Sequence, residues 1–483
     1  MRHALAWLLL VATLLSSTLA GSAQSGAAAS RLVGEVFAGG QQMRYLMLLS
    51  DEIGSRLTGS PGARRAEEAM EAEFKRLGLD AVRREPFTMP SSWERGTATA
   101  ALVSHGGRAL TVASYTWTPG TDKPFEGEVV DVGEGRAEDL RREAARLKGN
   151  VALVVPVGTD LNALIEKFYR TPVLVRELKE AGARAVLYAS DKQHTMLYTS
   201  PVDFTASARM AALPTLSLAS EDVSLLRRLL GQGTRPRVRL DVRNKTGPAF
   251  ESTNVVAEIK GRERPEEIVL VGAHLDSNDL GPGALDNAAG VAAVVETARA
   301  IKALGLKPRR TIRFVLFMGE EEGMIGSLAY VRRHREELDR TIAALIMDIG
   351  AGRPQGWFSM GRTDLDAELG ELMQPLRAFG PFVVEHAAFA ATDNAPFMAE
   401  GVPNLIMLQD ETAYLPVHHT IADTADKVEP RDYAAAVATL AATAYAIADR
   451  ERRFGRRMSA AEVKKMAADT KVEEQWRASG IWP

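Results

Sequence analysis

Short apolar runs alternate with helical stretches in the second half of the chain. Compact runs of aliphatic and β-branched residues occupy positions 267–271, 311–317, 343–347 and 404–408, and the clearest helical stretch between them covers 289–304. Runs of this length are typical of strands that are buried on both faces. Their alternation with helices predicts an α/β fold with a mixed, mostly parallel sheet sandwiched by helices, in a domain over residues 246–450.

A smaller α/β alternation precedes this domain. Its expected strands and helices are short, and they cover residues 129–132, 151–155, 173–181, 185–188, 214–218, 221–230 and 237–242. We therefore predict a separate unit over residues 126–245, inserted between the two parts of the larger domain. The first of those parts, residues 31–125, contains a helical region at 32–79 and short strands at 97–117.

The two ends of the chain differ from the rest. Residues 1–3 are a short basic start and residues 4–15 are almost wholly apolar, which predicts a secretory signal peptide over residues 1–23. No other segment approaches the roughly 20 apolar residues that span a bilayer, so we expect a secreted or periplasmic protein without stable membrane insertion after cleavage. Residues 451–483 alternate basic and acidic side chains, which predicts a charged, solvated helical tail.

Composition narrows the chemistry that is available. The 483 residues are 46% hydrophobic and 25% charged, with a formal net charge of −3, which is ordinary for a globular protein and provides no basic surface for nucleic acid. The chain has no cysteine, which excludes disulfides, thiolate zinc ligands and a cysteine nucleophile. An exported protein without disulfides is typical of a bacterial periplasm or culture medium.

Acidic and histidine side chains follow the apolar runs of the larger domain. His274 follows the first run, the pair Glu320 and Glu321 follows the second, and Asp348 follows the third. Because the carboxyl ends of parallel strands meet at one edge of a sheet, we expect these side chains to lie close together. Each of them alone has a commoner explanation, such as a surface ion pair or a solvated acidic helix face. Their joint occurrence at strand ends favours a single site.

Two loop residues complete a ligand set for two metal ions. Zinc binds imidazole nitrogen and carboxylate oxygen, and two ions about 3.5–4 Å apart need a carboxylate that contacts both. We expect Asp286 to be this bridge. The other ligands divide between the ions, with His274 and Asp348 on one and Glu321 and His419 on the other, or in another permutation.

The acidic run offers more carboxylates than metal binding needs. Side chains of adjacent residues diverge along an extended backbone, so one glutamate can bind metal while its neighbour reaches the water beside the metal. We assign the general base to Glu320 and the metal ligand to Glu321, and Glu322 is a third candidate.

Two further aspartates are placed to support the ligands. Asp276, two residues after His274, is expected to assist catalysis by accepting a hydrogen bond that fixes the tautomer of this imidazole. Asp423, four residues after His419, is expected to do the same for the second histidine.

Four segments carry a resemblance to a known family. Residues 273–277, 282–290, 314–327 and 419–428 resemble the metal-binding core of the dizinc aminopeptidase and glutamate carboxypeptidase family. Within it the chain is similar to the carboxypeptidase Q-like branch, because of Thr392-Asp393, Pro396-Phe397, Gly401-Val402-Pro403 and the double histidine at 418–419.

The resemblance implies roles for individual residues. The family's general base falls on Glu320 and its neighbouring zinc ligand on Glu321. The bridging aspartate falls on Asp286, which is often followed by a cis peptide bond, here to Asn287. The remaining ligands of the two Zn²⁺ ions per chain are then His274, Asp348 and His419.

The resemblance also implies domain organisation and partners. Residues 126–245 are similar to a protease-associated domain, the substrate is a peptide or dipeptide, and relatives suggest a homodimer. Two departures from the family pattern are visible. Asn394 stands where many relatives have histidine, which bears on substrate contacts, and His418 stands where an aromatic residue is common, so that either histidine of the pair could bind metal.

These observations lead to a functional hypothesis with two alternatives. We expect hydrolysis of a peptide bond near a chain end, at either the amino or the carboxyl terminus. A single-zinc cyclising acyltransferase on the same fold is one alternative, and the complete bridging set argues against it. A non-catalytic binding or receptor homologue is the other, although such a protein has no need to keep the whole set of acids and histidines.

Overall fold

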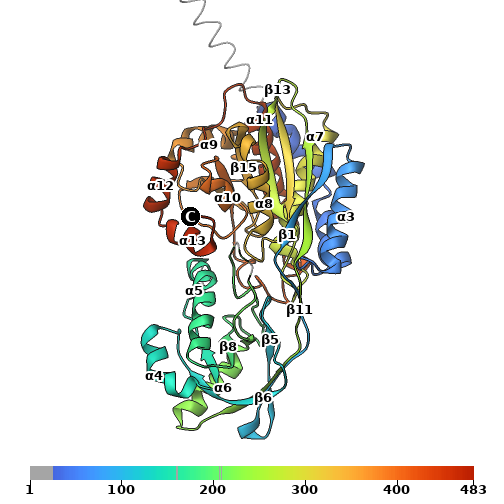
Figure 1. Ribbon diagram of the computed structural model, residues 1–483. Helices are drawn as coiled ribbons and strands as arrows, with labels where there is room; N and C mark the ends of the chain where they lie inside the picture. Colours follow the sequence, from blue (N-terminus) through green and yellow to red (C-terminus); the bar gives the residue numbers. More distant parts are fainter. Residues whose placement is uncertain (1–25, 159–160, 206, 208, 483) are drawn as a thin grey trace, which may run out of the picture.

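The protein consists of two units, each built on an eight-stranded sheet (Figure 1). This computed structural model describes residues 26–158, 161–205, 207 and 209–482, so the predicted signal peptide lies outside the described residues. The larger unit contains the N-terminal and C-terminal parts of the chain, and the smaller unit lies at one end of it.

Parallel strands form the centre of the larger sheet. β13 (Arg264–His274) pairs in parallel with β14 (Arg310–Phe317) and with β15 (Thr341–Ile346), which in turn pairs in parallel with β18 (Asn404–Gln409). Every residue of β14 and β15 is buried, as expected for strands covered on both faces. The fold class predicted from the sequence is therefore confirmed, with strand bounds within a few residues of the predicted ones.

Antiparallel pairs extend this sheet at both edges and make it mixed. On one side β12 pairs with β14 and with β1, and on the other β16 pairs with β18 and, in parallel, with β17. These outer strands are β12 (Phe250–Ile259) and β16 (Pro354–Phe358), followed at the two edges by β1 (Asp80–Met89) and β17 (Val383–Glu385).

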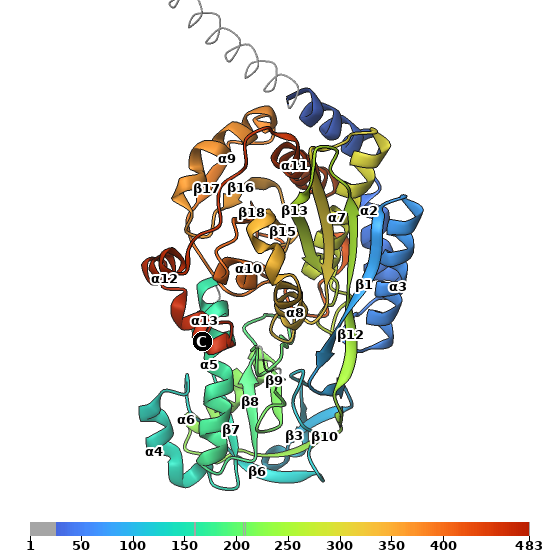
Figure 2. The same ribbon diagram turned by 45° about the horizontal axis from the view of Figure 1, so that its top comes forward.

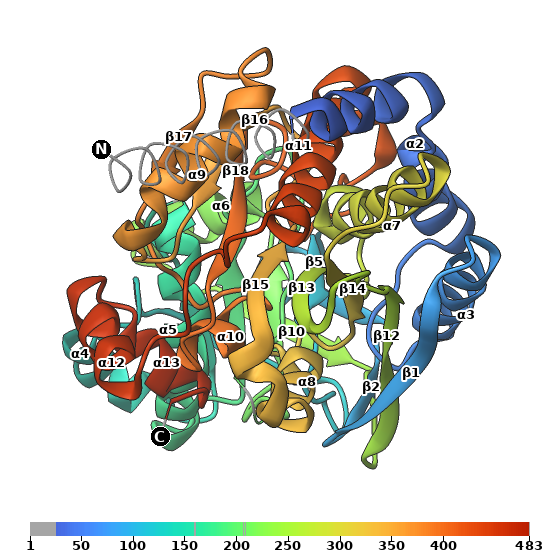
Figure 3. The same ribbon diagram turned by 90° about the horizontal axis from the view of Figure 1, so that it is seen from above.

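Helices cover both faces of this sheet (Figure 3). α3 (Pro61–Arg76), α7 (Ala289–Ala303) and α11 (Pro430–Asp449) lie on one face, and α8 (Ile325–Arg333) and α10 (Ala395–Ala399) on the other. α3 begins directly after Ser60, whose side chain accepts a hydrogen bond from the backbone N–H of Ala63 and caps the helix.

Among the described residues, the smaller unit has its own sheet and the three helices α4, α5 and α6 (Figure 2). Its strand order is β4-β3-β10-β6-β7-β8-β9-β5. The strands are β3 (Ala98–Leu102), β4 (Arg108–Leu110), β5 (Val112–Ser114), β6 (Phe125–Asp131), β7 (Val151–Val154), β8 (Ala185–Ala189), β9 (Thr215–Leu218) and β10 (Arg237–Val242). The helices are α4 (Ala137–Leu147), α5 (Leu161–Glu180) and α6 (Ser220–Gly231).

Two features of this unit differ from the sequence expectation. The sheet includes β3, β4 and β5, which precede residue 126. β3 pairs with β10 and β5 pairs with β9 across a long separation in sequence, and β4 joins the sheet by pairing with β3. α5 begins at Leu161 rather than at residue 173. The chain passes between the units through β2 (Ser92–Glu94) and β11 (Lys245–Gly247), which pair with each other. The assignment of residues 126–245 to a protease-associated domain stays a prediction.

The C-terminal tail forms helices that pack against the rest of the protein and are not simply solvated. α12 (Ala460–Asp469) and α13 (Glu473–Ser479) bury Met466 and Trp476. The Gln475 side chain also accepts a hydrogen bond of 3.0 Å from the backbone N–H of Ala390. A few apolar side chains on one side of these charged helices pack the helices against the rest of the protein. Among the described helices, none combines the length and the apolar character that a membrane span needs.

Candidate metal centre and active site

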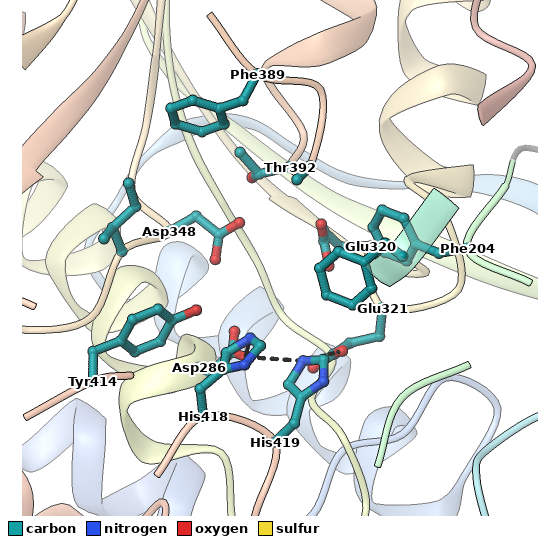
Figure 4. A pocket seen from close by; sticks show the side chains of 13 residues that line it. Phe204, Asp286, Glu320, Glu321, Asp348, Phe389, Thr392, Tyr414, His418 and His419 are labelled. Atoms are coloured by element: carbon teal, nitrogen blue, oxygen red, sulfur yellow. Dashed lines mark ion pairs between the residues drawn. The ribbon is translucent and has the colours of Figure 1, made fainter. Parts of the chain in front are cut away.

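The predicted ligands meet at the carboxyl edge of the larger sheet, and Figure 4 shows four of them, Asp286, Glu321, Asp348 and His419. His274 is the last residue of β13, Glu321 lies in the loop after β14, and Asp348 follows β15. Asp286 precedes α7, and His419 lies in the loop between β18 and α11. All of these side chains are buried or nearly so, because the loops that carry them fold over the strand ends.

Asp286 lies between two pairs of residues. Its Oδ1 is 3.1 Å from His274 Nε2, which is 2.9 Å from Asp348 Oδ1. Its Oδ2 is 3.2 Å from His419 Nε2, which is 2.9 Å from Glu321 Oε2. The two oxygens of one carboxylate therefore face two separate imidazole–carboxylate pairs, and the peptide bond from Asp286 to Asn287 is cis.

This donor set fits metal ions. Asp286 Oδ2 is buried against the Nε2 atoms of His418 and His419, and the described part of the chain provides no hydrogen-bond partner for the buried Nδ1 atom of His419. Buried polar atoms are normally satisfied. Ligand atoms of His274, Asp286 and Asp348 lie within 4.8 Å of one another, as do those of Asp286, His418 and His419. Mixed nitrogen and oxygen donors of this kind suit zinc.

The charges of the site are strongly coupled. Burial disfavours the charged imidazole of His274, yet the carboxylates of Asp348, Asp276 and Asp286 hold its pKa well above the ordinary value. Burial raises the pKa of Asp286, but hydrogen bonds from His274 and His419 hold that pKa well below its usual range. Burial and the nearby Asp348 and Asp393 raise the pKa of Glu320 well above its usual value.

The three consecutive glutamates have different environments. Glu321 accepts a 2.7 Å hydrogen bond from the backbone N–H of Asn278 and contacts His419. Glu320 lines the cavity, and none of its atoms takes part in the two imidazole–carboxylate pairs. Glu322 is fully buried, and burial together with the neighbouring Asp276 carboxylate raises its pKa well above the usual value. This separation follows from the turn that begins at Gly319.

Asp276 supports the site differently from the sequence expectation. Its carboxylate is 3.6 Å from His274 Nδ1, which instead lies 3.2 Å from the backbone oxygen of Asp276. The carboxylate accepts hydrogen bonds from the backbone N–H groups of Gly319, Glu320 and Glu321, at 3.0, 3.4 and 3.3 Å. Asp276 therefore shapes the loop that carries the glutamates, because that loop turns its N–H groups toward the strand end of β13.

The prediction that Asp423 supports the His419 imidazole is wrong. Its carboxylate accepts hydrogen bonds from the backbone N–H groups of Leu285 and Asp286, at 2.7 and 3.1 Å. The loop after His419 folds back over the segment before α7, so the aspartate reaches that backbone instead of the imidazole. Asp423 thus holds the backbone of Asp286 in place.

Arg56 binds the backbone of the segment that connects β13 to Asp286. Its guanidinium is fully buried and donates hydrogen bonds to the carbonyl oxygens of Leu275, Pro282 and Gly283, at 2.9, 2.6 and 2.9 Å. Burial lowers its pKa to about 10, although nearby carboxylates such as Asp423 oppose the shift. No sequence pattern shows this role, because these three carbonyl groups lie more than 200 residues from Arg56 along the chain.

Both histidines of the pair 418–419 face Asp286. Their Nε2 atoms each lie 3.2 Å from Asp286 Oδ2, and their rings stack with centroids 3.8 Å apart. His419 has φ of 59°, a left-handed conformation that turns two consecutive side chains to the same side. Glu321 distinguishes them, since an ion-pair contact to its carboxylate is observed for His419 alone among the described histidines.

A cavity that is open to solvent lies over the acids and histidines, and the empty space in it and in its mouth is about 570 Å³. Besides the predicted residues, it is lined by side chains that sequence reasoning missed, namely Phe168, Phe204, Ile349, Phe389, Ala391, Thr392 and Tyr414. Phe168 and Phe204 belong to the smaller unit. No pattern in the sequence marks these residues, since isolated aromatic residues in loops and helices are usually core residues.

Comparisons with known proteins agree on one family. The model of peptidase family M28 matches residues 254–444. Carboxypeptidase Q of Bos taurus is 31% identical over 407 residues, which are 84% of this chain and 85% of that protein. The crystal structure of a peptidase M28 precursor from Shewanella amazonensis is similar with a TM-score of 0.80 at 27% identity, over 91% of this chain and 100% of that one. A zinc aminopeptidase from Bacillus subtilis shares the fold, with a TM-score of 0.66 at 21% identity over 87% of this chain and 98% of that one.

Proposed function

The chain belongs to peptidase family M28, and from this premise we propose that it is an exported exopeptidase with two zinc ions and Glu320 as general base. Zinc-dependent exopeptidase activity on peptides follows from the family and from the relatives named above. The number of ions, the roles of the residues and the export are our proposals. The observation that supports them best is Asp286, whose two oxygens face two different histidines at 3.1 and 3.2 Å.

The ligands divide into two groups. His274 and Asp348 would hold one zinc ion together with Asp286 Oδ1, and Glu321 and His419 would hold the other together with Asp286 Oδ2. When bound, zinc lowers the pKa of a coordinated water and polarises a peptide carbonyl.

Glu320 performs the proton transfers. Its carboxylate lines the cavity beside the ligands. Because Glu321 is the proposed metal ligand, the Glu320 carboxylate does not need to bind metal. We propose that it accepts the proton of the attacking water and delivers this proton to the leaving amine. A raised pKa suits this role, because the carboxyl group must hold the proton between the two transfers. Asp276 positions Glu320 by binding the backbone of its loop.

Substitution of the base tests this assignment. Glu320→Gln is expected to keep near-normal zinc while turnover of a peptide substrate falls by at least about 100-fold, since general-base catalysis contributes that much or more. Metal analysis and kcat measure the two effects. Glu322→Gln is the matched control, and it should keep most turnover because its side chain is buried away from the cavity. If Glu320→Gln keeps a tenth of the wild-type rate, the assignment is wrong.

Metal content separates the two-zinc enzyme from a single-zinc relative. We expect two zinc ions per purified chain and complete loss of activity after chelation, with recovery on adding zinc. One ion per chain at full activity would contradict the bridging role of Asp286.

Cell fractionation tests the predicted signal peptide, and size-exclusion chromatography with light scattering tests the predicted homodimer.

A further inference from the structure

Two aromatic residues of the smaller unit form one wall of the catalytic cavity. Phe168 on α5 and Phe204 in the segment before β9 both line it. Their rings stack with centroids 4.9 Å apart, and the Phe168 ring lies 6.3 Å from that of His419. Phe168 and Phe204 are both buried. The cavity is therefore complete only where the two units meet.

Close contacts hold this wall against the loop that carries the glutamates. A Cβ atom built on Gly323, which has φ of 112°, would lie 2.4 Å from the backbone oxygen of Thr205. The glycine thus lets the glutamate loop touch the backbone next to Phe204. On the other side, the Tyr169 hydroxyl donates a 2.6 Å hydrogen bond to the carbonyl oxygen of Ala390. These contacts fix the aromatic pair relative to the site.

The place of the pair determines which part of a substrate it meets. Phe204 lies beside Glu320, whereas Phe389 and Tyr414 lie toward Asp348 (Figure 4). Glu320 delivers its proton to the leaving amine, so the residue that carries this amine must lie on the side of Glu320. The side chain of that residue therefore faces Phe168 and Phe204.

The chemistry of the wall indicates the side chain that it accepts. The described residues that line the cavity include no lysine and no arginine, so an acidic side chain would lose its hydration without gaining a cationic partner. An aromatic side chain would gain apolar contact and ring stacking. We propose that Phe168 and Phe204 form the subsite for the residue with the leaving amine, and that they select an apolar, preferably aromatic, side chain. This proposal rests on the proposed peptidase function.

Two series of dipeptides test it. The first varies the residue with the leaving amine (Ala-Phe, Ala-Leu, Ala-Gly, Ala-Glu), and the second varies the other residue (Phe-Ala, Gly-Ala). For the wild type, kcat/KM for Ala-Phe should exceed that for Ala-Gly by at least about tenfold, because apolar pockets discriminate by this amount or more. Phe204→Ala and Phe168→Ala should reduce this ratio toward one, with zinc content unchanged and the ratio of Phe-Ala to Gly-Ala unchanged.

Further variants distinguish loss of the subsite from loss of folding. Phe204→Leu and Phe168→Leu keep apolar bulk, so they should fold if the alanine variants do not, and they should lower the preference for Ala-Phe over Ala-Leu. Phe389→Ala, in the opposite wall, should keep the ratio of kcat/KM for Ala-Phe to that for Ala-Gly, whatever its effect on the overall rate. The proposal is overturned if the wild type shows no preference in the first series, or if the variants keep it. In either case chelator-sensitive hydrolysis of any dipeptide would leave the proposed function standing, whereas its absence would count against the function itself.

Discussion

The carboxyl edge of the larger sheet and the face of the smaller unit that covers it are built from different chemistry. The edge holds carboxylates and imidazoles, and its loops are fixed by buried polar groups such as Asp276, Asp423 and Arg56. The covering face provides the Phe168–Phe204 stack, and behind it the buried Tyr198 ring stacks on His419 with centroids 5.4 Å apart. The contrast indicates that reactivity belongs to one unit, and shape selection to the other.

The largest expected effect on the protein comes from substituting a proposed metal ligand at the sheet edge, because this tests directly whether reactivity belongs to the larger unit. His419→Phe should retain about one zinc ion per chain instead of two, because it removes the imidazole that faces both Asp286 and Glu321. His418→Phe should retain both ions, since among the described contacts His418 reaches Asp286 and not Glu321. Metal analysis after dialysis, with circular dichroism to verify folding, measures both. A reversed result would make His418 the ligand.

A smaller effect at the same edge is expected from Asp276→Asn. The amide keeps the shape but accepts fewer hydrogen bonds from the backbone of the glutamate loop and removes a charge 3.6 Å from His274 Nδ1. Outer residues of metal sites typically change affinity about 10- to 100-fold. Zinc affinity, measured by competition with a chelator, should fall within this range. Unchanged affinity together with unchanged kcat would show that Asp276 does not position the loop.

The smallest effect should come from Lys167, in the covering unit. Its Nζ lies 3.5 Å from the centre of the Tyr198 ring and has no hydrogen-bond partner in the described chain, and burial lowers its pKa to about 8. The folded state therefore loses the proton before the unfolded state does, and stability should rise as the pH increases from about 8 to 10.5.

Lys167→Met removes this penalty. The variant should melt about 2 °C higher than wild type at pH 7, and the difference should shrink toward pH 10. Thermal melts across this range measure it, with Lys123→Met at an exposed position as the matched control. Zinc content and kcat should not change. A loss of zinc in Lys167→Met would contradict the division between the two units.

Part of the site was predictable because it depends on local pattern. His274, Glu321 and Asp348 end or follow buried strands, and the ends of such strands can be recognised from apolar runs and the polar residues after them. The structure brings these residues together with Asp286 and His419. The roles of Asp276 and Asp423 were predicted less well, since both lie near a histidine in sequence but bind the backbone of another loop.

The amino-acid sequence by itself determined the parallel centre of the larger sheet and which acids and histidines stand at its carboxyl edge, since hydrophobic periodicity records which faces of an element are buried. Only the tertiary structure decided that Glu322 is buried away from the cavity, that Arg56 binds the distant segment 275–283, and that Phe168 and Phe204 complete the wall. These features depend on contacts between segments that lie far apart along the chain, and the pattern within a segment carries no information about which distant segment it will meet.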